Sequence, residues 1–145
     1  MKSEPHVYSI DDLKRDGISD WHGVRNYEAR NCMKAMAVGD RAFFYHSSAE
    51  PTGIAGIMAV SRAAHPDPTQ FDKTSEYFEP RATKGRPVWF HVELRFLEKL
   101  PRLLPAGELR GDPALEGMKL FTRGRLSVQP VTPEQWRRIL AIARR

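Results

Sequence analysis

The sequence predicts a single α+β domain, residues 1–145, in which a mixed β-barrel is surrounded by short helices. A length of 145 residues suits one ordinary domain with a substantial core. Short strand candidates alternate with turns and short helices, which is typical of a barrel and unlike the regular βαβ order of a parallel sheet. No glycine-rich phosphate loop follows a strand candidate, which argues against nucleotide-cofactor folds.

Helices are expected where capping signals precede an apolar pattern. Ser9, followed by acidic residues, predicts a short helix through about Arg15 that ends at Gly17. The stretch Thr132–Gln135 combines a capping box with proline at the first helical position, so it opens a terminal helix through about Ala143. Further helices are expected over residues 25–36, 107–110 and 113–117.

Strands are expected where apolar residues alternate or cluster. Val88–Phe96 alternates apolar with other residues, as a half-buried antiparallel strand does. Ile54–Val60 is nearly all apolar, which suits a strand buried on both faces. Arg41–Ser47 and the shorter Leu126–Val128 are the other candidates. Between strands, Pro66–Pro87 is a long polar excursion, either a functional loop or a plain surface crossover.

Composition narrows the function classes. The formal net charge is +5 and the pI is about 9.6, which favours phosphate-rich partners but is also met in ordinary soluble surfaces. No apolar run is long enough for a membrane span, and no signal peptide is evident, so we expect a cytoplasmic protein, or a nuclear one in a eukaryote. The single cysteine, Cys32, excludes an internal disulfide and a Cys-rich zinc site. We expect no cofactor and no metal.

The first cluster of candidate site residues runs from Trp21 to Asn31. It places an indole, arginines, amides and a phenol around a helix start, the partners that a stacked base and its polar edges need. The helix N-terminus would also favour a phosphate. The alternative is that Trp21 and Tyr27 are core residues and that Asn26 is a structural cap.

The second cluster is the aromatic strand ending in His46 and Ser47. Alternation puts Phe44 and His46 on one face and Phe43, Tyr45 and Ser47 on the other. One face must enter the core, and the other can line a pocket. A histidine in such a strand is often a satisfied structural residue, which is the alternative for His46.

The third cluster is the segment from Arg123 to Pro130. Two arginines, Arg123 and Arg125, flank a glycine and could meet phosphates. Ser127 and Gln129 follow, and these short polar side chains could stand at a pocket rim. The alternative is a basic surface turn.

These segments together resemble the EVE domain family of the PUA-like superfamily. The matching stretches cover nearly the whole chain in order: Lys2–Pro5, Tyr8–Leu13, Trp21 with Gly23–Tyr27 and Ala29–Asn31, Phe43–Ser47, Pro51 with Gly53–Gly56, and Leu120–Arg123 with Arg125–Pro130. The resemblance implies a PUA-like pseudo-barrel and a relation to YTH domains, which hold N6-methyladenine in an aromatic cage. It also implies binding of modified bases, modified cytosines in particular, in DNA or RNA.

One departure from the family is His22, which stands where many relatives carry aspartate. If that carboxylate contacts the ligand, the preferred base would differ in this chain. The sequence also carries no fused nuclease or ATPase domain, so any effector function would come from a separate protein partner.

We therefore expect a monomeric, non-catalytic domain that recognises a modified base, such as methylated or hydroxymethylated cytosine. The expected base-binding residues are Trp21, Val24, Asn26, Tyr27, His46, Ser47, Ser127 and Gln129, and the expected phosphate-binding residues are Arg25, Arg30, Arg123 and Arg125. Two alternatives stay open. One is an enzyme acting on a small molecule or nucleotide, although no nucleophile-elbow or His-Glu-x-x-His pattern is present. The other is a protein-interaction adaptor with a vestigial pocket.

Overall fold

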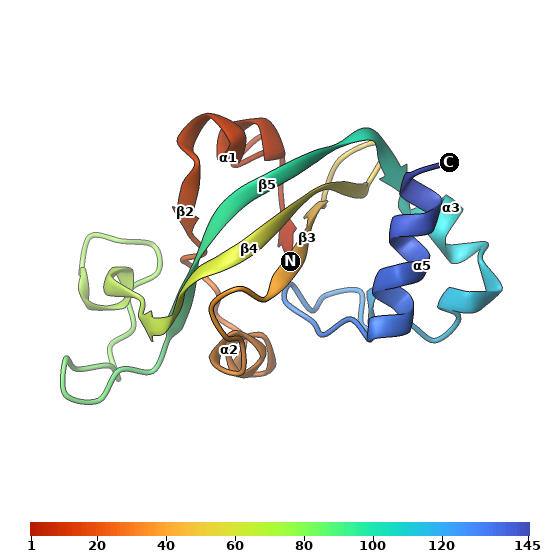
Figure 1. Ribbon diagram of the computed structural model, residues 1–145. Coiled ribbons are helices and arrows are strands. Elements are labelled where there is room, and N and C mark those ends of the chain that lie inside the picture. The colour runs from red at the N-terminus through yellow and green to blue at the C-terminus, as the bar shows by residue number, and fades with distance from the viewer.

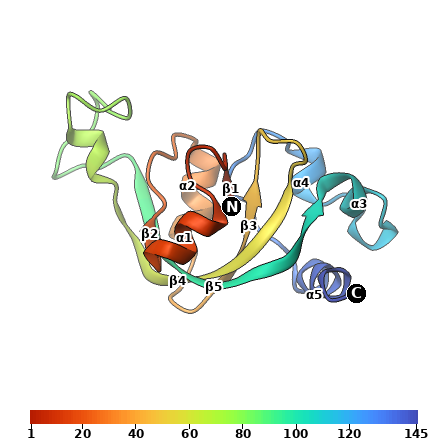
Figure 2. The same ribbon diagram turned by 90° about the horizontal axis from the view of Figure 1, so that it is seen from above.

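The computed structural model describes residues 1–145 as one five-stranded sheet with helices on both faces (Figure 1, Figure 2). The strands are β1 (Lys2–Ser3), β2 (Ile18–Asp20), β3 (Arg41–His46), β4 (Gly53–Pro66) and β5 (Phe90–Pro105). The helices are α1 (Ile10–Asp16), α2 (Tyr27–Lys34), α3 (Ala106–Arg110), α4 (Lys119–Thr122) and α5 (Pro133–Ala143), with short 3-10 helices at Pro68–Phe71 and Pro113–Leu115. The predicted α+β class is confirmed.

The strand order in the sheet is β1-β3-β4-β5-β2. β1 pairs parallel with β3, and the other neighbours are antiparallel. The edge strands β1 and β2 do not pair with each other, so the barrel stays open on that side. The long, curved β4 and β5 run side by side through the molecule, and residues 67–89 form the excursion that connects them at one end (Figure 1).

Each face of the sheet buries its own apolar cluster. α1, α2 and the segment after α4 cover one face, where Phe44, Met58 and Leu94 are fully buried. α3 and α5 cover the other face (Figure 2). Phe43 and Tyr45 belong to the apolar cluster on that face. The alternation predicted for β3 is therefore confirmed. β4 is buried from residue 53 to 60 because helices cover both faces of the sheet there.

Local signals explain where the helices begin. Ser9 and Thr132 each close a capping box, and they start α1 and α5 as predicted. Asn26 is extended, with φ −133°, and caps α2, so that helix begins at Tyr27 and not at Arg25. No helix in the fold is long and apolar enough to cross a bilayer.

Several predictions need correction. Leu126–Val128 is not a strand, although its alternation is right: Leu126 and Val128 are buried, and Ser127 is half-buried. The segment makes one backbone bond to β1, which is too few for a ladder. β4 and β5 are longer than predicted because they continue to pair with each other beyond their most apolar stretches. The edge strands β1 and β2 and the helix α4 are too short for periodicity to reveal.

Candidate nucleic-acid interface

The three predicted clusters adjoin one another, and β1 joins two of them. Ser3 pairs with His46 at the end of β3. The backbone N–H of Ser47 donates to Ser3 O at 2.9 Å, and that of Lys2 donates to Ser127 O at 2.8 Å. The short first strand therefore lies between the His-Ser strand end and the Ser-Val-Gln segment, which the sequence separates by about eighty positions.

The first and third clusters meet at a polar cleft of about 270 Å³. We call it the arginine cleft; it is lined by Asn26, Thr122, Arg123, Gly124, Arg125 and Leu126. One wall is the N-terminal end of α2, and the other is the turn after α4. The cleft therefore combines a helix N-terminus with two guanidinium groups, an arrangement suited to an anionic ligand.

Asn26 serves both as a cap and as a cleft residue. Its side-chain Oδ1 accepts a hydrogen bond from Ala29 N at 2.9 Å, which satisfies an otherwise unpaired N–H of α2. No bond within the chain involves its amide nitrogen, and the residue is exposed. The structural-cap alternative is correct for the oxygen, while the amide N–H groups stay available to donate to a ligand.

Basic side chains surround the arginine cleft. Lys2 Nζ donates to Gly124 O at 2.8 Å. Arg123 pairs with Glu28, and Lys119 Nζ lies 3.9 Å from the same carboxylate. Arg125 is exposed and makes no ion pair. The surroundings of the cleft thus hold four cations, two of which share the one carboxylate of Glu28, and the resulting positive potential attracts phosphate.

Trp21 lies in the core behind this region. It is only 8% exposed, and its ring packs edge-to-face on Phe44 with centroids 5.4 Å apart. Val24 is also 8% exposed, and both residues belong to the buried cluster that contains Leu126. Neither residue lines the arginine cleft itself. Leu126, which lines the cleft, packs in the same apolar cluster as both residues.

The exposed aromatic surface next to the cleft comes from Tyr27. Its side chain is 48% exposed and leans on Trp89, with ring centroids 4.9 Å apart. The guanidinium of Arg30 lies 4.8 Å from the Tyr27 ring and donates to Val88 O at 2.9 Å. A half-exposed ring that already contacts a cation is a suitable platform for a base. The sequence did not single out Trp89, which alternation placed on the more polar side of its strand.

Arg25 positions the excursion between β4 and β5. Its guanidinium donates to Tyr77 O, Val24 O, the carboxylate of Asp67 and Thr69 Oγ1. These bonds use all five of its N–H groups. The phosphate contact predicted for Arg25 would therefore require one of these bonds to break.

Gly23 brings the same loop close to the Trp21 segment. Its φ is +81°, and an added Cβ would lie 2.7 Å from Tyr77 Cζ. Only glycine fits both the backbone conformation and the close approach. The Gly23–Asn26 stretch is therefore held between the excursion and the core, which fixes the position of the Asn26 cap.

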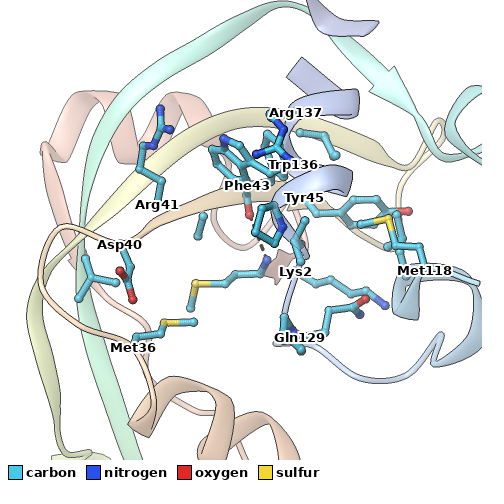
Figure 3. Close-up of a pocket in the computed structure, with 18 residues that line it drawn as sticks. Lys2, Met36, Asp40, Arg41, Phe43, Tyr45, Met118, Gln129, Trp136 and Arg137 are labelled. Carbon is cyan, nitrogen blue, oxygen red and sulfur yellow. Dashed lines mark hydrogen bonds between the residues drawn. The ribbon is translucent and has the colours of Figure 1, made fainter. Parts of the chain in front are cut away.

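Gln129 lines a different and larger cavity, of about 530 Å³ (Figure 3). There Trp136 of α5 stacks on Phe43, with ring centroids 3.9 Å apart. Gln129 Nε2 donates to Leu126 O at 2.9 Å, and its Oε1 is buried without a partner. Gln129 therefore lies between the two cavities, bonded to the floor of one and lining the other.

His46 has a structural role at the start of α1. Its Nε2 accepts a hydrogen bond from Ile10 N at 3.1 Å, and its ring packs edge-to-face on Phe44. Burial lowers the pKa of His46 below its ordinary 6.5. The ring is therefore neutral at pH 7, and only Nδ1 is left for a ligand.

Replacing His46 with glutamine is expected to reduce the loss of stability on acidification. Unfolded His46 takes up a proton near pH 6.5, but the folded residue does so only at lower pH. The unfolded chain therefore gains protons first, and stability falls as the pH drops below about 6.5. Thermal melts between about pH 7 and pH 5 test this. A His46→Gln curve that follows the unchanged protein would contradict this role for His46.

Comparison with known proteins identifies the family. The family model described as "EVE domain" matches residues 1–142. Human thymocyte nuclear protein 1 is 40% identical, with 98% of this chain and 72% of the relative covered. A Pseudomonas putida protein of known structure is 49% identical, with a TM-score of 0.95 and coverage of 99% and 97% of the two chains.

A further solved structure is the human THYN1 protein in complex with 5-methylcytosine-containing DNA. It is 39% identical to this chain, has a TM-score of 0.94, and the match covers 100% of this chain and 96% of that one. The resemblance inferred from the sequence motifs is confirmed by these matches, and the chain belongs to the EVE domain family.

Proposed function

We propose that this chain binds DNA that carries 5-methylcytosine, and that the arginine cleft and the adjoining Tyr27 face the nucleic acid. The observation that supports this most is the likeness, along the full chain, to a human protein solved with 5-methylcytosine-containing DNA. The cleft adds an independent physical argument. It combines unpaired amide and guanidinium donors with an exposed aromatic ring, which suits a base and its flanking phosphates.

The predicted residues take different parts in this proposal. Asn26 and Tyr27 contact the base, and Trp21 and Val24 support the surface beneath it. Arg123 and Arg125 contact phosphates, with Arg30 beside the Tyr27 ring. The remaining predicted base-binding residues, His46, Ser47, Ser127 and Gln129, border the region near β1.

The binding free energy of a flipped, methylated base is the sum of several contributions of known size. Stacking on an aromatic ring contributes about 1–3 kcal/mol per base, and flipping a base out of a duplex costs a few kcal/mol. A buried methyl group adds only about 0.8 kcal/mol, or roughly fourfold in affinity. Phosphate contacts and hydrogen bonds to the base edge must therefore supply most of the net affinity, with the methyl group as a modest addition.

Titration of labelled duplexes at fixed salt tests the proposal. Two duplexes of the same sequence, one with a single 5-methylcytosine and one with cytosine, are compared by fluorescence anisotropy. The methylated duplex is expected to bind about fourfold more tightly. Mass spectrometry of the recovered oligonucleotide should show no change, as binding without catalysis requires. Equal affinity for both duplexes would reject recognition of the methyl group, and an altered oligonucleotide would favour an enzyme.

Replacing Arg125 with alanine is expected to reduce the salt dependence of DNA binding. A phosphate contact contributes about 0.9 to the slope of log K against log salt, which corresponds to about eightfold in affinity at about 0.1 M salt. Arg95→Ala is the matched control, because Arg95 is also exposed and makes no ion pair but lies on β5. If both variants keep the original slope, Arg125 does not contact phosphate.

A further inference from the structure

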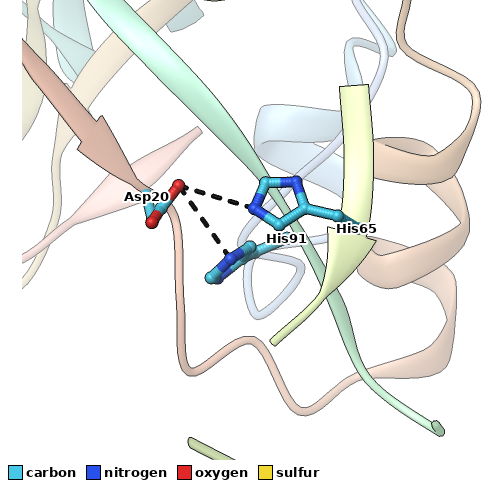
Figure 4. A group of neighbouring side chains, drawn as sticks. All are labelled: Asp20, His65 and His91. Atoms are coloured by element: carbon cyan, nitrogen blue, oxygen red, sulfur yellow. Dashed lines mark ion pairs between the residues drawn. The ribbon is translucent and has the colours of Figure 1, made fainter. Parts of the chain in front are cut away.

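Two histidines and an aspartate from three different strands meet where the 67–89 excursion joins the sheet, a place we call the neck of the excursion (Figure 4). His65 lies near the end of β4 and pairs in register with His91 near the start of β5. Asp20 ends β2, whose partner strand is β5. The sheet thus brings together residues that the sequence keeps far apart, which is why their spacing gave no metal signal.

The ring nitrogens of both histidines face the same carboxylate. Asp20 Oδ1 lies 3.7 Å from His65 Nε2 and 3.9 Å from His91 Nε2. The three ligand atoms lie within 4.8 Å of one another. Both distances to Asp20 exceed those of a hydrogen bond. The two contacts are long ion pairs (Figure 4), and the three groups point to a common centre without hydrogen bonds to one another.

We propose that Asp20, His65 and His91 bind a divalent transition-metal ion, with zinc as the expected ion. Tetrahedral zinc bound to nitrogen and oxygen at about 2.0–2.2 Å has its ligand atoms about 3.4 Å apart, so ligand atoms that now lie up to 4.8 Å apart must approach one another by up to about 1.4 Å, a change that side-chain rotation can supply. Two imidazoles and one carboxylate are a ligand set used by zinc and by other first-row metals. Asp20 is 48% exposed, so water has access to the remaining coordination position.

The surroundings of the two histidines fit this ligand role. His65 Nδ1 lies 2.9 Å from Ala63 O, and a proton on Nδ1 leaves the lone pair of Nε2 free for a metal. His91 is 3% exposed, and its Nδ1 is buried without a hydrogen-bond partner. That Nδ1 lies 3.9 Å from the Asp67 carboxylate, which is placed to orient the ring after a shift of roughly 1 Å.

The bound ion would join β2, β4 and β5 where the 67–89 excursion begins and ends. The site is separate from the arginine cleft, whose lining residues it does not share. Its predicted effect is on the stability of this end of the sheet, and it does not depend on the DNA-binding proposal.

Isothermal titration of the EDTA-treated full chain with zinc chloride tests the site. One ion per chain is expected, together with a higher Tm, because an ion that binds only the folded state stabilises it. Magnesium chloride should give neither effect, since magnesium prefers all-oxygen sites. Absence of saturable zinc binding at one ion per chain would overturn the proposal.

Ligand variants locate the ion. Asp20→Asn and His65→Gln are each expected to weaken zinc binding by at least about tenfold. His6→Gln is the matched control: His6 Nε2 also faces a carboxylate, 3.3 Å from Glu4, but has no second histidine beside it. Circular dichroism without metal checks that each variant is folded. Because Asp20 is exposed, the Asp20→Asn variant is expected to fold, and it tests the site even if His65→Gln fails to fold. Zinc affinity that is unchanged in Asp20→Asn, or lost equally in His6→Gln, would contradict the assignment.

Discussion

Replacing Asp67 with alanine is expected to lower the free energy of unfolding by about 3–5 kcal/mol, because it leaves a half-buried arginine without its counter-charge. The Asp67 side chain is completely buried. Its carboxylate accepts bonds from Gly23 N at 2.8 Å, Arg25 at 3.2 Å and Thr69 N at 2.9 Å. Removing the carboxylate leaves donors unpaired both in the excursion, at Thr69, and in the segment that precedes α2, at Gly23 and Arg25. The excursion should therefore detach from the segment that carries Asn26.

Asp72→Ala is the matched control for this prediction. Asp72 makes the same local turn, accepting bonds from the backbone N–H and hydroxyl of Thr74, but it is exposed and has no arginine partner. Urea unfolding of the two variants measures the difference in stability. A loss of similar size in both variants would show that the local turn, and not the buried ion pair, gives Asp67 its effect.

Replacing Trp21 with alanine is expected to cost about 3–5 kcal/mol of stability and to remove the preference for methylated DNA. The buried indole packs on Phe44, and Leu126, which lines the arginine cleft, lies in the same apolar cluster. The vacated volume would let the cleft floor shift. Unfolding measurements give the stability, and DNA titrations are made at a temperature where the variant is folded.

Trp136→Ala is the control for Trp21. Trp136 is a half-buried tryptophan on α5, and its partner Phe43 belongs to the cluster on the opposite face of the sheet. This variant should lose less stability and keep its preference for the methylated duplex. If Trp136→Ala removes that preference while Trp21→Ala keeps it, the DNA-binding surface lies at the larger cavity and not at the arginine cleft.

Much of the fold was predictable because local signals and global packing agree. The capping boxes at Ser9 and Thr132 start real helices, and alternation correctly separated Phe43 from Phe44. What the sequence could not give was the edge strands, each only two or three residues long. Their positions depend on pairing with distant strands, and no periodic pattern encodes that pairing.

For the candidate site, the sequence predicted the right segments more reliably than the role of each side chain. Asn26 and Arg125 lie at the cleft, as their polarity suggested, while Arg25 and His46 make bonds within the chain. Residue type alone does not distinguish these cases, because an arginine donates equally well to a phosphate and to a backbone carbonyl. The buried Asp67 was missed, although the Asp-Pro-Thr order that starts its 3-10 helix carries a capping signal.

Mapping of amide chemical shifts during titration with the methylated duplex tests most directly whether the arginine cleft binds DNA. If it does, the largest changes occur at residues 26–30 and 122–127, around the cleft, and helix α5 is little affected. Changes concentrated on α5 and around Trp136, with residues 122–127 unperturbed, would place the DNA at another surface and contradict the proposed interface.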